Sequence, residues 1–181
     1  KKYNFFVHIF YKYFLVMHKE NELYNKIVIL SRNKFFYTDL DFNDTFTNRI
    51  HLIFLHISFL LIIDKKSLNE QKKLFNQKLF YFTFKKIEEN YRELGFGDIS
   101  VNKNMKKLVK NFYNILFNCE NYQNKNFKEK CSFLLRYLDV KKHKKHTNNL
   151  ALIDYFDKYQ VFCLDLSLDN VLKGNLNFTY K

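Results

Sequence analysis

Apolar residues recur at helical spacing along most of the chain, and this pattern predicts helices throughout. The predicted helices cover residues 23–32, 45–66, 67–94, 127–138 and 147–166, with another that starts after Asn102 and a short last one that ends near Lys173. Residues 33–43 are aromatic and irregular, and neither an internal repeat nor a linker rich in Pro, Gly or Ser divides the chain. The pattern therefore predicts a single compact all-α domain of about six to eight helices.

Polar residues and glycines mark where several of these helices begin and end. Asp44-Thr45 is placed to cap the helix that follows it, and Ser67 with Glu70 forms the S-x-x-E pattern of a capping box. Gly95 and Gly174 each come just after a predicted helix end, where glycine is common.

The helix that Asn102 is placed to cap is the clearest amphipath of the chain. Its apolar face consists of Met105, Leu108, Val109, Phe112 and Leu116. Its opposite face carries Lys103, Lys106, Lys107 and Lys110. This basic face is either the solvated side of a helix in a Lys-rich chain or a tether that contacts phosphate, on ribosomal RNA or on anionic lipid headgroups.

Two apolar runs are too short to cross a bilayer. Residues 5–17 are apolar and aromatic, but they contain His8 and Lys12, and no small-residue cleavage site is present. We interpret residues 1–19 as an N-terminal apolar and aromatic helix or extension, which precedes the main domain at residues 20–181. The second run, residues 50–63, has the length of a buried core helix. We therefore predict no transmembrane segment.

Composition narrows the class of protein. Of the 181 residues, 47% are hydrophobic and 19% aromatic, three are Gly and none is Pro. These values exclude collagen-like, Pro-rich and disordered chains, and they disfavour a turn-dense β-sandwich. The net charge is +13, but only four of the 31 basic residues are Arg, and the abundance of Lys, Asn, Phe and Tyr follows A/T-rich codons. Charge alone therefore does not indicate a nucleic-acid partner.

The sequence carries no signature of catalysis or of metal binding. Cys119, Cys131 and Cys163 are too far apart for a CxxC motif and are typical of buried thiols in a reducing compartment. His51 and His56 are five residues apart and do not share a helical face, so each is interpreted as a core histidine with a satisfied hydrogen bond. We therefore expect a protein that is not an enzyme and that uses no metal and no cofactor.

Several segments, taken in order, resemble a known family. The most specific is the run Arg92-Glu93-Leu94-Gly95-Phe96-Gly97-Asp98-Ile99-Ser100-Val101, followed by Lys103, Met105-Lys106-Lys107 and Phe112-Tyr113. The others are residues 23–28, Ser31-Arg32, Phe36-Tyr37, Asp44-Thr45, Arg49, Leu55-His56, Leu172-Lys173-Gly174 and Phe178. This combination resembles the ubiquinol–cytochrome c chaperone family, the assembly factors of ubiquinol–cytochrome c reductase (respiratory complex III). One departure is Asn43, which stands where the family usually has Pro.

The resemblance implies an assembly chaperone. Its client would be newly synthesised cytochrome b, and its further partners would be a small helical protein and the ribosome or an anionic membrane surface, with no DNA. Its location would be cytoplasmic, peripheral at the cytoplasmic face of the inner membrane, or on the matrix side in a mitochondrion. The alternative is a basic helical protein that binds RNA or the membrane surface without a role in respiratory complex assembly.

The resemblance also singles out residues. Arg92, Gly95, Gly97 and Asp98 form the family-motif turn, in which the two glycines are expected to adopt backbone angles that other residues resist and Arg92 to bond Asp98 or helix-end carbonyls. The other motif residues are candidates for structural roles: Arg32, Asp44, Arg49, His56 and Tyr113. We expect a groove lined by aromatic residues of the apolar helices to shield the client, while the lysines at 103, 106, 107 and 110 act as the tether.

Overall fold

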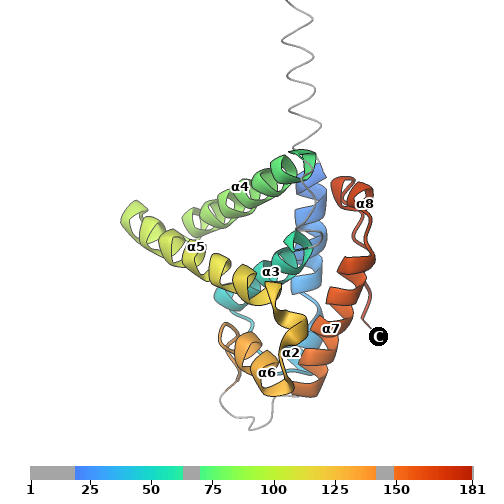
Figure 1. Cartoon of the computed structure of the whole chain (residues 1–181). Coiled ribbons are helices and arrows are strands. Elements are labelled where there is room, and N and C mark those ends of the chain that lie inside the picture. Colours follow the sequence, from blue (N-terminus) through green and yellow to red (C-terminus); the bar gives the residue numbers. More distant parts are fainter. Residues whose placement is uncertain (1–18, 63–69, 142–148, 181) are drawn as a thin grey trace, which may run out of the picture.

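The computed structural model describes residues 19–62, 70–141 and 149–180, and most of these residues are helical (Figure 1). Residues 19–31 are helical and are followed by α2 (Lys34–Thr38), α3 (Phe46–Leu61), α4 (Glu70–Glu93), α5 (Asp98–Glu120), the 3-10 turn η1 (Tyr122–Asn124), α6 (Phe127–Leu135), α7 (Asn149–Asp165) and α8 (Leu168–Leu172). Within those ranges the β-pairing is an isolated antiparallel bridge between Phe42 and Val140. The predicted all-α domain is confirmed. The N-terminal extension up to residue 18 and the capping residue Ser67 lie outside the described residues.

Helix α3 is the centre of the core. Every residue from Ile50 to Leu60 is buried, including the polar side chains of His51, His56 and Ser58. The helix packs against α5 on one side and α7 on another. A helix that is apolar around its whole circumference is expected to be enclosed in this way, so the interpretation of this run as a core helix is confirmed.

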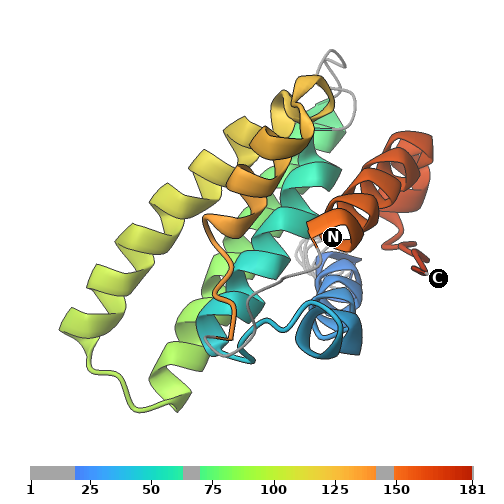
Figure 2. The same cartoon turned by 90° about the horizontal axis from the view of Figure 1, so that it is seen from below.

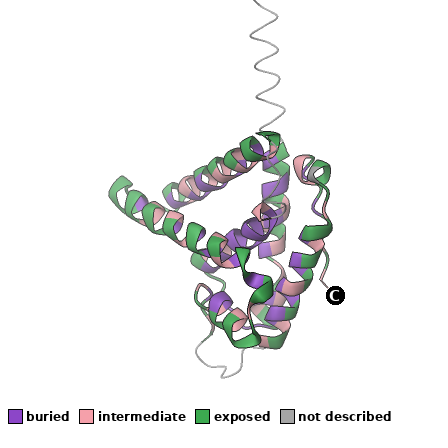
Figure 3. Ribbon diagram, viewed as in Figure 1, coloured by how far each residue is buried: buried purple, intermediate pink, exposed green. Residues whose placement is uncertain are grey.

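Helices α4 and α5 form an antiparallel hairpin that we call the α4–α5 arm, residues 70–120. The turn of this arm lies on the side of the molecule away from α7 and α8 (Figures 1 and 2). Each helix of the arm is buried along one face and exposed along the other, whereas α3 is buried on all sides from Ile50 to Leu60 (Figure 3). The arm therefore presents two long solvent-facing surfaces.

The C-terminal segment after α8 closes the fold. Gly174 has a φ of +69°, and a Cβ at this position would lie 3.2 Å from the Glu22 Cβ in the first described helix. The following residues run along α7, where the ring of Phe178 lies 5.1 Å from that of Tyr159 and the Tyr180 hydroxyl donates to an Asp154 carboxylate oxygen at 2.8 Å. Gly174 thus has the role of a helix-ending glycine that the sequence predicts.

Several predicted boundaries differ from the structure; the helix predicted over 45–66, for example, ends at Leu61. Asn102 does not cap a helix, because α5 already begins at Asp98 with Gly97 as the N-cap residue. An acidic residue in the first turn is favourable next to the positive end of the helix dipole, and this supports the earlier start. Residues 33–43 are not irregular throughout, since Asn33 caps the short helix α2. The helix predicted over 127–138 ends at Leu135.

Candidate functional site

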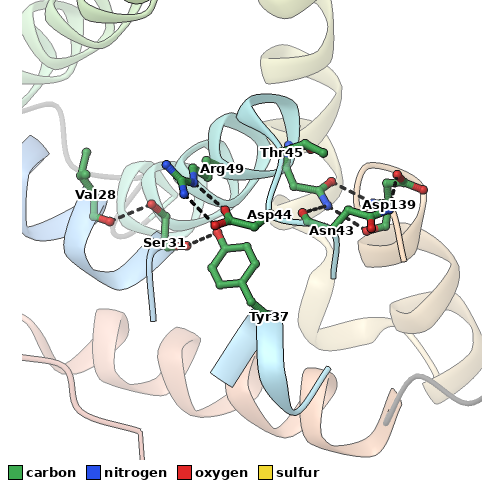
Figure 4. A network of polar contacts seen from close by, with 9 residues as sticks. Val28, Ser31, Tyr37, Asn43, Asp44, Thr45, Arg49 and Asp139 are labelled. Atoms are coloured by element: carbon green, nitrogen blue, oxygen red, sulfur yellow. Dashed lines mark hydrogen bonds and ion pairs between the residues drawn. The ribbon is translucent and has the colours of Figure 1, made fainter. Parts of the chain in front are cut away.

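Two motif residues form an ion pair where α3 begins (Figure 4). The Arg49 guanidinium donates to both carboxylate oxygens of Asp44, at 2.6 and 2.7 Å. This hydrogen bonding, with the nearby charge of Arg32, lowers the pKa of Asp44. The Thr45 hydroxyl caps α3 by accepting from the Asn48 amide at 3.2 Å, so the predicted Asp44-Thr45 helix start is confirmed.

A shallow surface pocket adjoins this ion pair. Its volume is about 330 Å³, and its lining residues are Arg32, Lys34, Tyr37, Thr38, Asp44 and Arg49. The Tyr37 hydroxyl donates to the Ser31 carbonyl at 2.7 Å (Figure 4), and burial raises the pKa of Tyr37 to about 12. The structure therefore brings Arg32, Asp44 and Arg49 together in a pocket with more positive than negative charge.

Asn48 is a key residue of this region that the sequence does not reveal. Its side-chain amide donates to the Asn43 carbonyl at 2.7 Å and to the Asp139 carbonyl at 2.8 Å, while its oxygen accepts from the Asp139 amide at 2.8 Å. These bonds join α3 to the segment after α6, 91 residues away. Asn43 strengthens the same joint, since its backbone N–H donates to the Asp139 carbonyl at 3.0 Å, a bond that the usual Pro could not make. The signal in the sequence was only a polar residue at an inward-facing helical position.

His56 and His51 are both core residues, as predicted. His56 is fully buried; its Nδ1 lies 2.6 Å from the Leu52 carbonyl and its Nε2 lies 2.7 Å from the Tyr155 hydroxyl. Because a carbonyl only accepts, Nδ1 carries the proton and Nε2 accepts from Tyr155. His51 is held in the same way between the Tyr137 carbonyl and the Asn111 amide. Burial lowers the pKa of both imidazoles, that of His56 to about 4, so both are neutral near pH 7.

The family-motif turn connects the helices of the arm. Arg92 donates to Glu88 at 2.9 Å within α4 and also bonds Asp98 at the start of α5, which confirms the predicted contact across the turn. Gly95 has a φ of +84°, a conformation that favours glycine. Gly97 has a φ of −70° and a ψ of 159°, which any residue adopts, so the expectation of a special conformation there is wrong.

Ring contacts link this turn to the ion pair at the start of α3. Phe46 in the first turn of α3 lies 5.0 Å from the ring of Tyr91, which in turn lies 5.3 Å from that of Phe96 in the turn. The motif residues near 44–49 and those near 92–98 therefore occur at one end of the molecule, although they are far apart in the sequence.

The four lysines of α5 lie on its solvent-facing side. Lys103, Lys106, Lys107 and Lys110 are all exposed, opposite the buried residues Leu108 and Phe112. Among the ion pairs of the described residues, none involves these lysines. The face that the sequence predicts is therefore present; its role as a tether remains a prediction.

The predicted aromatic groove is not formed by the apolar helix. The aromatic residues at the centre of α3, Phe54 and Phe59, are fully buried within the core, because α3 is enclosed on all sides. Exposed aromatic residues occur instead on the α4–α5 arm. Tyr113, one of the motif residues, is half-exposed there, and its ring lies 5.9 Å from that of Phe80.

The described residues include neither a cluster of metal ligands nor a membrane-spanning helix. They contain no group of three or more His, Cys, Asp or Glu that could hold a metal ion. Burial raises the pKa of the thiols of Cys119, Cys131 and Cys163, which disfavours the nucleophilic thiolate. Across the same ranges, none of the helices combines the length and apolarity needed to span a bilayer.

Comparison with known proteins identifies the family. The family model described as "Ubiquinol-cytochrome C chaperone" matches residues 38–130, about half of the chain. The chain belongs to the ubiquinol–cytochrome C chaperone family. The crystal structure of the Cbp3 homolog from Brucella abortus is similar to this chain with a TM-score of 0.78 at 22% identity, over 97% of each chain, so the two share a fold. No curated protein matches the sequence significantly.

The segment that matches the chaperone family contains most of the candidate site. Residues 38–130 include the Asp44–Arg49 ion pair, the family-motif turn and the lysine face. They include the whole of α3, α4 and α5, but not Arg32 in the pocket wall or Tyr155, which bonds His56. In this member of the family, the matched segment therefore packs into the same core as the helices on either side of it.

Proposed function

We propose that the chain is a non-catalytic assembly chaperone that binds newly made cytochrome b and assists the biogenesis of ubiquinol–cytochrome c reductase. Membership of the chaperone family supports the assembly role. The exposed apolar surface of the α4–α5 arm supports the binding of an apolar client. Cytochrome b is such a client, because its membrane segments are exposed to water before insertion.

The arm carries most of the large apolar side chains that the described part of the chain exposes. Seven of those twelve residues lie on it: Leu74, Tyr81, Leu94, Phe96, Ile99, Tyr113 and Phe117. Leu74 and Tyr81 are seven residues apart in α4 and therefore lie on one face of that helix, where Tyr81 is 72% exposed. Apolar side chains gathered on one element are typical of an interaction surface. We infer that the α4 face with Leu74 and Tyr81 contacts the client.

The state of the ionisable core residues supports the non-catalytic part of the proposal. His51 and His56 are neutral and use both ring nitrogens in hydrogen bonds, so neither is available to move a proton. We further propose that the protein acts at the cytoplasmic face of the inner membrane, or on the matrix side in a mitochondrion, and that a small helical protein is its partner.

Site-specific photocrosslinking tests the client. A photoreactive phenylalanine analogue replaces Tyr81 on α4 in the full chain, and the matched control replaces Val161, which is 57% exposed on α7. We expect newly synthesised cytochrome b to be crosslinked at position 81 and not at position 161. Crosslinking of cytochrome b at neither position, or equally at both, would contradict the proposed client surface.

Deletion of the gene tests the assembly role separately. We expect the amount of assembled ubiquinol–cytochrome c reductase on a native gel to fall and to be restored by the wild-type chain. Normal reductase in the deletion strain would exclude the chaperone and favour the alternative, a basic helical protein that binds RNA or the membrane surface without a role in assembly.

A further inference from the structure

The solvent-facing side of α5 combines apolar and basic residues in one line. At 3.6 residues per turn, Ile99, Lys103, Lys106, Lys110 and Phe117 fall within a sector of about 60°. Ile99 is 88% exposed and Phe117 is 65% exposed, although both are large apolar side chains. We call these five residues the α5 face. An apolar residue thus stands at each end of the face, with three lysines between them.

The positive charge of the α5 face is not neutralised within the described residues. From Ile99 to Cys119, helix α5 contains four Lys and neither Asp nor Glu. Several exposed lysines outside α5 are paired with carboxylates, as in Lys158 with Asp154 and Lys173 with Asp169. Asp98, at the start of α5, is bonded by Arg92. The face is therefore suited to a partner that carries negative charge.

The shape of the arm makes this face accessible to a flat partner. The distance along α5 from Ile99 to Phe117 is about 27 Å at 1.5 Å per residue. The turn, with the exposed side chains of Leu94 and Phe96, lies at the end of the arm away from α7 and α8 (Figures 1 and 2). A planar surface can therefore contact the face and the apolar turn together.

We propose that the α5 face, with Leu94 and Phe96 at the turn, docks on the surface of a bilayer that contains anionic lipids. The lysines contact the headgroup phosphates, and Ile99 and Phe117 enter the boundary between headgroups and acyl chains. Docking in this way needs no membrane-spanning helix.

The apolar residues favour lipid over RNA as the partner. The transfer of aliphatic side chains such as Ile99 and Leu94 from water to an apolar medium lowers the free energy, and the bilayer boundary supplies such a medium. RNA instead offers phosphates and base faces, which bind Arg and aromatic residues as well as Lys. The α5 face contains no Arg, and its one aromatic side chain, Phe117, stands at the end of the face away from the turn. The inference does not depend on the identity of the client, and purified protein with pure lipid tests it.

Tryptophan fluorescence tests the geometry directly, because the chain contains no Trp. The variant Ile99→Trp places a reporter on the α5 face, and Val161→Trp places a matched reporter on α7. With vesicles of phosphatidylcholine and phosphatidylglycerol, we expect a blue shift of the emission for Ile99→Trp and none for Val161→Trp, and no shift for either with phosphatidylcholine alone. An equal shift in both variants, or no shift in Ile99→Trp, would overturn the proposal.

Removal of the lysine charges is the second test of the docking proposal. In one variant Lys103, Lys106, Lys107 and Lys110 become Gln. The control variant changes the same number of exposed lysines outside α5, namely Lys73, Lys128, Lys158 and Lys173. Since each lysine near an anionic surface contributes about fivefold to binding, we expect the loss of four lysines to lower the vesicle partitioning of the first variant by roughly 600-fold. The control should retain most of its binding.

Two outcomes would overturn the docking surface. Equal losses in the two lysine variants would mean that net charge alone is responsible. Unchanged vesicle binding, with loss of binding to ribosomal RNA in the first variant only, would identify RNA as the partner of this face. Far-UV circular dichroism checks that each variant is folded.

Discussion

At the scale of the residue, Asn48 shows how one buried polar side chain joins distant parts of the chain. Its three hydrogen bonds to Asn43 and Asp139 replace contacts with water. In Asn48→Ala the Asp139 amide loses its partner and the Asn43 and Asp139 carbonyls each lose one of two donors, so we expect the free energy of unfolding to fall by about 2 kcal/mol. Urea unfolding measures this, with Thr47→Ala, at the exposed neighbouring position, as the control. A loss no larger than that of the control would show that the joint contributes little.

The three glycines should differ in their tolerance of a Cβ. Gly97 has an ordinary φ and no atom within 4 Å of an added Cβ, so Gly97→Ala should be neutral within about 0.5 kcal/mol. Gly95→Ala meets no atom either, but its φ of +84° should cost about 1 kcal/mol. Gly174→Ala should cost more, because it adds contacts of 3.2 and 3.3 Å with Glu22 and Lys19 to the same strain. Thermal unfolding measures the loss of stability in each of the three variants. An equal loss in Gly97→Ala and Gly95→Ala would contradict this order.

At the scale of the element, the sequence predicts what depends on nearby residues and misses what depends on distant ones. Periodicity identifies α3, α4, α5 and α7, and the glycine at 95 identifies the turn of the arm. The start of α5 was predicted five residues late, because Asn102 is a good cap by composition while the actual N-cap residue is Gly97, which caps without a side chain. A groove lined by aromatic residues of the apolar helices was predicted, because an apolar run such as α3 does not show which other helices will cover it. Asn48 was missed because its partner is 91 residues away.

The arm's turn offers a prediction at this scale. The side chain of Asp98 is 75% exposed, so its pair with Arg92 is screened by solvent and should stabilise the whole fold only weakly. Its effect should be local: in Arg92→Gln, the Val101 amide, which donates to the Gly97 carbonyl at 3.0 Å, should exchange its hydrogen faster. Lys86→Gln removes a comparable pair with Glu89 inside α4 and should leave this exchange unchanged. A loss of global stability as large as that of Asn48→Ala would contradict a solvent-screened pair.

At the scale of the whole molecule, a cluster of aromatic rings joins the helices on the two sides of His56. The His56 ring lies 4.7 Å from that of Tyr159 and 5.7 Å from that of Tyr155, both on α7, and 6.1 Å from that of Phe36 on α2. Helices α2, α3 and α7 therefore meet around a neutral imidazole that is fully buried. Protonation of this ring would place an unpaired charge in the core, so the stability of the fold should depend on pH.

The sign and size of this dependence follow from the pKa of His56, which is about 4 in the folded chain and 6.5 as its ordinary value. Between these values the unfolded chain binds the proton and the folded chain does not, so stability is full above pH 6.5 and is lost as the pH falls toward 4. Between pH 7 and pH 5 His56 should account for a loss of about 2 kcal/mol in the free energy of unfolding, to which His51 adds in the same direction.

A double variant, His56→Phe with Tyr155→Phe, tests this. It removes the titration of His56 and leaves no Tyr155 hydroxyl without a partner, so it should lose less stability than the wild type between pH 7 and pH 5. Carboxylates with lowered pKa contribute equally to the pH dependence of both proteins. The difference between the urea midpoints of the two proteins therefore gives the contribution of His56. An identical pH dependence in the two proteins would show that the buried imidazole does not control the acid stability of the fold.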